Sequence, residues 1–237
     1  MWSGPRNLST ALMRSFSSRP DTVVLDEPFY AFYLRETRIS HPGREDVIAN
    51  CESDWRKVAD QVCGPVPGGK RVWYQKHMAH HMLPAVDVAR LVEGGALTHA
   101  LLIRDPAEVI TSYTKVHANM TLAETGLPYQ VDLFERATAA TGRRPAVVDA
   151  KDLLLDPRRT LSALCAALGL EFTDAMLSWP AGPHPQDGVW ALHWYASVQK
   201  STGFEPYRAK SEPVPPHMER VHREARELYD RLAPHRL

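Results

Sequence analysis

The sequence predicts an α/β protein built on a mainly parallel sheet. Short apolar runs alternate along the chain with longer stretches of helical periodicity, which is the pattern of strands joined by crossover helices. The runs contain β-branched, aromatic and aliphatic residues, as in strands that are buried on both faces. They lie at residues 23–25, 72–74, 100–103 and 146–148.

One more strand is expected at the start of the chain. The loop at residues 3–10 has the character of a turn that follows a central strand of about five or six residues. Only Met1 and Trp2 precede Ser3. We therefore expect either that the chain as given begins inside this strand or that the fold tolerates a shortened central strand.

Helices are expected between the strands. Apolar residues repeat on one helical face over residues 8–16 and again over residues 161–168, where Gly169 is suited to ending the helix. Asp105 and Asp156 are each followed by proline, which places an N-cap acid before a residue suited to the first helical position. These signals fix two helix starts.

The last quarter of the chain has a different composition. Residues 178–216 contain many prolines and several aromatic residues, among them Trp179, Trp190, Trp194 and Tyr195, so we interpret this segment as a loop-rich cover over one edge of the sheet. An amphipathic helix is expected at about 216–233, and its apolar side is predicted to face the core. The length is consistent with a single domain over residues 1–237. The predicted core residues of the helix are Met218, Val221, Leu228 and Leu232.

The composition excludes several classes of protein. The chain has 237 residues with 28 Lys+Arg and 28 Asp+Glu, and this zero net charge disfavours a nucleic-acid binder that works by phosphate neutralisation. No apolar run approaches the roughly 18 residues of a membrane span, and no signal peptide is visible, so we expect a cytoplasmic protein with no membrane partner. Cys51, Cys63 and Cys165 are expected to be reduced thiols. The sequence does not indicate an oligomeric state.

Polar residues follow the predicted strands. Ligands of open α/β sheets bind beyond the carboxyl ends of the strands. Arg6, Glu27, Lys76 and Arg104 all lie directly after predicted strands, so a neutral protein concentrates cations around one crevice. This arrangement indicates an anion site.

The loop at residues 3–10 carries the most chemistry. A turn that opens a helix leaves backbone N–H groups unpaired, and these groups favour a phosphate or sulfate group. Ser9 and Thr10 add hydroxyl groups and Arg6 adds a charge, although Asn7, Ser9 and Thr10 are equally suited to capping the helix. The pattern GxxxxGK[ST] is absent, which argues against an ordinary magnesium-dependent kinase or NTPase.

Three segments resemble a known family. The loop SGPRNLST at residues 3–10 resembles the 5′-phosphosulfate loop of sulfotransferases that use 3′-phosphoadenosine 5′-phosphosulfate. Residues 102–113, LIRDPAEVITSY, resemble the 3′-phosphate motif of that family, which implies that Arg104 and Ser112 contact the 3′-phosphate. Residues 149–170 resemble a structural segment of the family. The resemblance implies a three-layer α/β/α fold of the P-loop NTPase-like, sulfotransferase type.

Two further segments resemble catalytic regions. LDEPFY at residues 25–30 is similar to the F-E-P stretch of carbohydrate sulfotransferases, which implies that Glu27 is the base. Lys76-His77 and the following HMLP resemble the K-x-H-L-P region of cytosolic sulfotransferases, which implies a phosphosulfate-binding lysine and a catalytic histidine. His77 adjoins the lysine where the family leaves a one-residue gap. Whether His77, His80, His81 or none of them is the base therefore stays open.

The same histidines have the spacing of a metal site, but no carboxylate accompanies them at a suitable distance in the sequence, so we expect no metal. KSTGF at residues 200–204 loosely resembles the R-K-G loop that folds over the 3′-phosphate. The candidate catalytic residues are Glu27, Arg6, Lys76 and His77, and the candidate cofactor-binding residues are Arg6, Asn7, Ser9, Thr10, Arg104, Ser112, Lys200 and Ser201.

The resemblance implies transfer of a sulfuryl group from 3′-phosphoadenosine 5′-phosphosulfate, by in-line displacement and without a metal, to a hydroxyl or less often an amine. The acceptor is expected to be a small molecule or a glycan. Two alternatives remain: a P-loop kinase or NTPase, and a nucleotide-binding regulatory protein without catalysis.

Overall fold

A five-stranded parallel sheet forms the centre of the computed structural model, which describes residues 1–210 and 212–237. The order is β2-β3-β1-β4-β5: the chain crosses from the central strand β1 to the edge strand β2, returns to β3 beside β1, and then moves outward through β4 and β5 on the other side. This confirms the predicted α/β class. The strands are β1 (Trp2–Ser3), β2 (Thr22–Asp26), β3 (Val72–Met78), β4 (Ala100–Ile103) and β5 (Ala146–Asp149).

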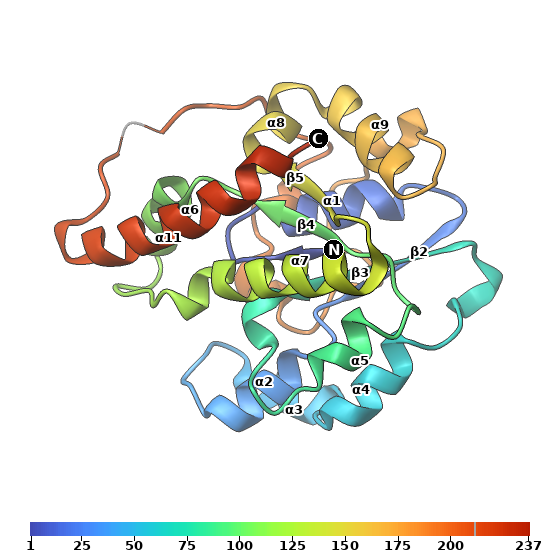
Figure 1. Ribbon diagram of the computed structural model, residues 1–237, viewed down its shortest axis with the longest axis horizontal. Helices are drawn as coiled ribbons and strands as arrows, with labels where there is room; N and C mark the ends of the chain where they lie inside the picture. Colours follow the sequence, from blue (N-terminus) through green and yellow to red (C-terminus); the bar gives the residue numbers. More distant parts are fainter. Residues whose placement is uncertain (211) are drawn as a thin grey trace.

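Helices cover both faces of this sheet, with α7 and α11 in front of it in Figure 1. Alternate residues of β4 enter different cores: Leu101 and Ile103 pack with α7 and α11, whereas Ala100 and Leu102 pack with α1, α8 and α9. The two-residue period of the strand produces this division. The helices are α1 (Ser9–Ser17), α2 (Tyr30–Thr37), α3 (Arg44–Asn50), α4 (Trp55–Val62), α5 (Val88–Val92), α6 (Pro106–Tyr113), α7 (Leu127–Thr141), α8 (Ala150–Leu155), α9 (Pro157–Ala167), α10 (Ala191–Trp194) and α11 (Glu219–Leu232).

The predicted strands agree with the structure except at β3, and the first strand is short, as expected. The central strand β1 is two residues long, and the carbonyl of Met1 extends its ladder by accepting a hydrogen bond from the backbone N–H of His77. The strand expected at residues 72–74 continues to Met78. Lys76 and His77 therefore lie inside a strand, not after it, and their side chains point to opposite faces of the sheet.

Both predicted helix caps are present. Asp105 accepts a hydrogen bond from the backbone N–H of Ala107 at the start of α6, and Asp156 accepts one from Arg159 at the start of α9. The predicted terminal helix corresponds to α11 and a preceding 3₁₀ turn, Pro216–Met218. Met218 and Leu232 are buried there, as expected.

The segment expected to be a loop-rich cover contains one short helix, α10, within otherwise irregular backbone and 3₁₀ turns. An isolated antiparallel bridge joins Ser178 to Gly203, which closes the segment into a large loop. Its middle part lies against the carboxyl ends of the strands and contributes Trp194 and Tyr195 to a cavity there.

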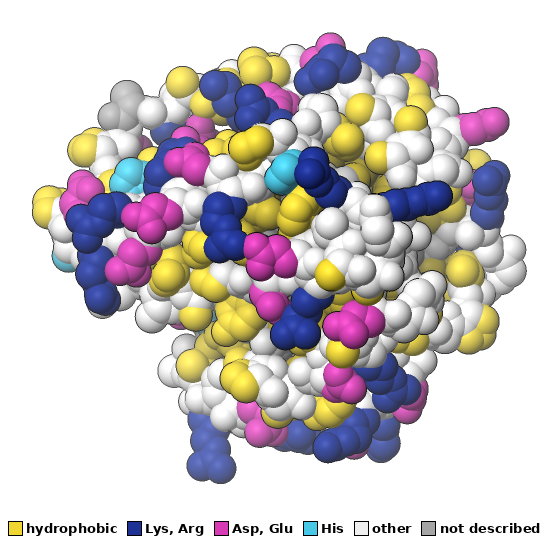
Figure 2. Space-filling view, in the orientation of Figure 1, with side chains coloured by type: hydrophobic (Ala, Val, Ile, Leu, Met, Phe, Trp, Pro, Cys, Tyr) yellow, Lys and Arg dark blue, Asp and Glu magenta, His cyan; other side chains and the backbone are white. Residues whose placement is uncertain are grey.

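The surface carries charges of both signs. On the face drawn in Figure 2, Lys and Arg side chains are interspersed with Asp and Glu, and no extended basic patch covers this face. Among the described residues, no helix has the length and apolar character needed to cross a membrane.

Candidate functional site

A cavity of about 510 Å³ lies at the carboxyl ends of the strands. The loop between β1 and α1 forms one wall of this cavity, and the ends of β2 and β3 with the start of α2 form another. The cover segment closes part of the third side. Nine of the candidate residues line it: Arg6, Asn7, Ser9, Thr10, Glu27, Lys76, Arg104, Ser112 and Ser201.

The loop between β1 and α1 has an unusual backbone. A Cβ atom on Gly4 would lie 2.0 Å from the carbonyl oxygen of Thr125, so this position requires glycine. Arg6 and Leu8 have positive φ angles of 63° and 68°, and Glu27 at the opposite wall has φ 39°. Each such residue costs on the order of 1–3 kcal/mol, and strain of this kind clusters at functional sites. All three line the cavity.

Two arginines meet at this loop. The Nε atom of Arg6 donates a hydrogen bond to Oγ of Ser112 at 3.0 Å, and an Nη atom of Arg104 donates to the backbone carbonyl of Arg6 at 2.7 Å. Burial, followed by the charge of Arg104, lowers the pKa of Arg6. The other nitrogens of Arg104 contact Glu108 on α6. The structure therefore brings Arg6, Arg104 and Ser112 together, as expected for an anion site.

The polar residues of the loop divide into two kinds. Asn7 is buried, and its side-chain amide donates to the carbonyl of Leu102, so it holds the loop to β4. Ser9 and Thr10 lie in the first turn of α1, whose N-cap position is occupied by Leu8 without a side-chain cap. The first N–H groups of α1 thus adjoin the cavity, which suits an anion.

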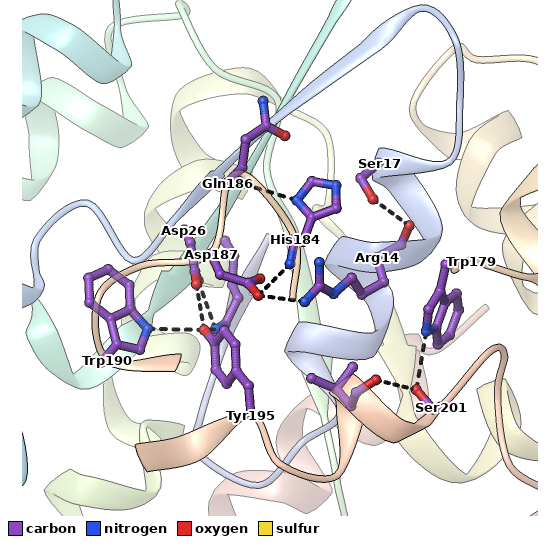
Figure 3. Close-up of polar contacts among 12 residues, drawn as sticks. Arg14, Ser17, Asp26, Trp179, His184, Gln186, Asp187, Trp190, Tyr195 and Ser201 are labelled. Atoms are coloured by element: carbon purple, nitrogen blue, oxygen red, sulfur yellow. Dashed lines mark hydrogen bonds and ion pairs between the residues drawn. The ribbon is translucent and has the colours of Figure 1, made fainter. Parts of the chain in front are cut away.

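Lys76 lies in a fully satisfied polar cluster at the base of the cavity. Its Nζ atom lies 2.9 Å from Asp26, 2.7 Å from Glu27 and 2.7 Å from the hydroxyl of Tyr195. An ammonium group has three donors, and all three are used here. Figure 3 shows the hydroxyl of Tyr195 between Asp26 and the indole of Trp190, which donates to it at 3.1 Å.

The charges in this cluster are set by burial and by the neighbouring groups. Burial by itself lowers the pKa of Lys76, but the carboxylates of Asp26 and Glu27 outweigh it and hold this pKa well above its usual value. Burial raises the pKa of Glu27, the charge of Lys76 opposes this, and Asp26 adds to it. Glu27 is 12% exposed, whereas Lys76 is 1% exposed. Glu27 is therefore the more exposed side of this ion pair.

The structure corrects the placement expected for His77. Its ring stacks on Trp2 with a centroid distance of 4.4 Å and lies near Phe29, and its Nε2 atom is 3.0 Å from Oε1 of Gln75. Strand alternation sends His77 to the face opposite Lys76. His77 is buried in that core and does not line the cavity.

His80 and His81 do line the cavity. They lie in a 3₁₀ turn, Ala79–His81, and pack on the rings of α2: His81 stacks on Tyr33 at 4.6 Å, and His80 meets Tyr33 edge-on at 5.2 Å. Burial lowers the pKa of His80 to about 4 and that of His81 well below its usual value. Both rings are therefore neutral near pH 7. Within the described ranges, no group of three ligating side chains is arranged to hold a metal ion.

Residues 200–204 were expected to fold over the 3′-phosphate, and only one of the two candidate residues in this segment lines the cavity. Ser201 lines the cavity, but its hydroxyl already donates to the carbonyl of Val198 and accepts from the indole of Trp179 (Figure 3). Lys200 is exposed and is absent from the cavity wall. Lys200 therefore does not reach the cavity in which a nucleotide is expected to bind.

Several residues of the site were not predicted from the sequence. Asp26 adjoins Glu27 in the sequence and pairs in register with Lys76, so the two adjacent acids were a usable signal. Tyr195 lies 119 positions from Lys76, and no local pattern connects the two. The aromatic side chains of α2 also carried no signal, since rings at such positions ordinarily fill a core.

The fold and the cavity define an α/β protein with a cavity lined by Arg6, Lys76 and Arg104 at the carboxyl edge of a parallel sheet. Residues 1–229 match the family described as "Sulfotransferase domain", so the chain belongs to the sulfotransferase family. This confirms the resemblance seen in the sequence. The family comprises transferases of sulfuryl groups.

Solved structures with this fold are similar over nearly the whole chain. A sulfotransferase from Alicyclobacillus acidocaldarius aligns with TM-score 0.59 and 16% identity, covering 100% of this chain and 95% of that one. The sulfotransferase domain of the Synechococcus PCC 7002 olefin synthase aligns with TM-score 0.54 and 19% identity, covering 94% and 92%. At such identities the likeness shows the fold.

Two curated proteins of Arabidopsis thaliana are similar in sequence. Branched-chain-amino-acid aminotransferase-like proteins 1 and 2 are 42% and 40% identical to this chain over 204 residues. The match covers 86% of this chain but 36% and 35% of the two relatives. The chain thus spans about a third of the length of these relatives.

Proposed function

We propose that the protein transfers a sulfuryl group from 3′-phosphoadenosine 5′-phosphosulfate to a hydroxyl group of its acceptor. The observation that carries this proposal is the convergence of Arg6, Arg104, Ser112 and Glu27 on one cavity at the N-terminus of α1. Two arginines and free helix N–H groups suit a doubly phosphorylated nucleotide, and a carboxylate opposite them suits a base.

In the proposed reaction the acceptor oxygen attacks the sulfur atom in line with the bond to the 5′-phosphate. A new S–O bond forms, the S–O bond to the phosphate breaks, and the electron pair leaves on the phosphate oxygen. The acceptor proton passes to Glu27. Arg6 is the cation best placed to stabilise charge on the leaving oxygen, because its Nη atoms make no hydrogen bond or ion pair among the described residues.

Lys76 takes a different role from the one the resemblance implies. Its three donors are occupied, so it reaches a sulfuryl oxygen only by releasing a partner. Glu27 is the partner at the cavity surface. We propose that protonation of Glu27 by the acceptor weakens this ion pair and frees Lys76 to stabilise the transferred group.

The names of the Arabidopsis relatives raise aminotransferase chemistry as a second possibility for those longer proteins. A lysine that forms a Schiff base must lose its proton. Of the described residues, Lys76 is the lysine in the cavity wall, and two carboxylates keep its pKa raised. This site therefore favours sulfuryl transfer.

Calorimetry with adenosine 3′,5′-bisphosphate and with ATP plus magnesium tests the donor. We expect binding of the bisphosphate that is insensitive to EDTA and tighter than that of ATP. Preferential binding of ATP with magnesium would instead support the kinase alternative. Tight bisphosphate binding with no transfer of labelled sulfate to any acceptor in an extract would support a regulatory protein.

A further inference from the structure

The part of the cavity beyond Glu27 is lined by rings, and we call it the acceptor lobe. His41 stacks on Trp194 with a centroid distance of 4.9 Å, and His117 lies 5.7 Å from Trp194 and 5.1 Å from Tyr113. These rings form a continuous wall that joins α2, α6 and the cover segment. The acceptor lobe comprises Tyr33, His41, Tyr113, His117, Glu124 and Trp194.

Glu124 is the carboxylate of this lobe. Its Oε2 atom accepts hydrogen bonds from the backbone N–H and the hydroxyl of Thr121, at 2.6 and 2.8 Å. This is the reciprocal arrangement of a capping box. Among the described residues, the Oε1 atom makes no hydrogen bond, and no Lys, Arg or His nitrogen lies within ion-pair distance of the side chain. Glu124 is half-buried, so its charge is only partly hydrated.

The surroundings do not neutralise this charge. Burial lowers the pKa of His41 to about 4, which leaves the neighbouring imidazole neutral near pH 7. Burial and the charge of Glu124 raise the pKa of Tyr33 and of Tyr113 to about 12, so both rings stay protonated close to the carboxylate. Deeper in the cavity, Asp26 and Glu27 outnumber Lys76 by one charge.

We propose, resting on the sulfotransferase function above, that the natural acceptor carries an ammonium group, which binds between Glu124 and the rings of the acceptor lobe while its hydroxyl meets Glu27. A cation over aromatic faces is stabilised by their quadrupoles, and the carboxylate supplies the opposite charge. A neutral acceptor would bury Glu124 without a partner, which is costly. An anionic acceptor would meet two negative carboxylates.

Two matched pairs of probes test this class: tyramine with its neutral isostere 4-propylphenol, and choline with 3,3-dimethylbutan-1-ol. Their binding to the full chain is measured by calorimetry, with and without adenosine 3′,5′-bisphosphate. We expect at least one ammonium probe to bind about tenfold more tightly than its isostere. Glu124→Gln should bring that ratio to near one, since glutamine keeps the capping box but not the charge.

Glu205→Gln is the matched control, because it removes one charge from an exposed residue of the same cavity outside the acceptor lobe. It should leave the ratio within about twofold of the wild-type value, well inside the expected tenfold effect. Three results overturn the proposal: no binding of either ammonium probe, equal binding of both members of each pair, or equal weakening of both members by Glu124→Gln. Failure of the bisphosphate to bind would overturn the sulfotransferase donor instead, because the probe ratio is also measured without nucleotide.

Discussion

The Nζ atom of Lys76 lies 2.7 Å from Oε1 of Glu27, and this ion pair connects the buried interior of β3 to the surface of the cavity. The pair joins a cation whose donors are all occupied to a carboxylate that faces the acceptor lobe. A carboxylate held in this way is fixed in direction before any ligand arrives. Such preorganisation is what the proposed general-base role of Glu27 requires.

Glu27→Gln should reduce sulfuryl transfer by about 10²-fold or more, because a positioned base contributes on the order of 10²–10⁴ to the rate. Burial raises the pKa of Glu27 above its usual 4.5, so the wild-type rate should rise with pH through that raised pKa as the base loses its proton. A kcat/KM profile against pH checks this. The exposed variant Glu45→Gln should keep the profile; an unchanged profile in Glu27→Gln would assign the base elsewhere.

The same shift predicts a pH dependence of stability. Between 4.5 and its raised pKa, Glu27 holds a proton in the folded chain that the unfolded chain has lost. The contribution of this group to the free energy of unfolding therefore falls as the pH rises through that window. In urea unfolding across this pH window, the free energy of unfolding of the wild type should decline relative to that of Glu27→Gln. A rise relative to Glu27→Gln would mean that folding lowers the pKa of Glu27.

Tyr195→Phe should lower both stability and turnover. The substitution leaves Lys76, Asp26 and Trp190 each without one hydrogen-bond partner, which costs about 1–3 kcal/mol of unfolding free energy. We expect kcat to fall while the affinity for adenosine 3′,5′-bisphosphate stays the same, because Tyr195 positions Lys76 and not the nucleotide. Tyr129→Phe is the control, since the hydroxyl of Tyr129 makes no hydrogen bond among the described residues. Equal loss in both variants would contradict a positioning role.

Arg104→Ala should weaken recognition of the 3′-phosphate. A hydrogen bond to a charged group is worth about 1.5–3 kcal/mol, which corresponds to about 10–150-fold in affinity. Wild-type protein should prefer adenosine 3′,5′-bisphosphate over adenosine 5′-monophosphate, and Arg104→Ala should remove most of that preference. Arg158→Ala removes a surface guanidinium that is 57% exposed and should change neither affinity. Retained preference in Arg104→Ala would exclude the 3′-phosphate contact.

Asp187→Asn should loosen the cover segment. Asp187 forms a 2.6 Å ion pair with Arg14 of α1, and the two side chains are 6% and 3% exposed (Figure 3). Removing the charge of one partner of a buried ion pair costs about 3–5 kcal/mol of unfolding free energy. The exposed pair of Arg158 and Asp174 gives the control, because Asp174→Asn should cost less than about 1 kcal/mol. Urea unfolding and limited proteolysis of residues 178–216 measure the two effects, and equal costs would contradict this account.

The fold was largely predictable because its signals are local. Apolar runs of the right length mark β2, β4 and β5, and the caps at Asp105 and Asp156 mark two helix starts. The extent of β3 was not predictable from propensity, because Gln75, Lys76 and His77 are polar. They join the strand since β1 and β2 supply backbone partners on both sides.

By itself the sequence determined the class of fold and the candidacy of the loop at residues 3–10 and of Arg6, Glu27 and Arg104, because each of these follows from a short local pattern. The tertiary structure decided which neighbours those side chains have. In the tertiary structure His77 packs in the core, and Tyr195 contacts Lys76 although the two are 119 positions apart in the sequence. Aromatic and histidine rings lie together with Glu124 in the cavity wall. Contacts of this kind depend on strand alternation and on the path of a long cover, which no local pattern encodes.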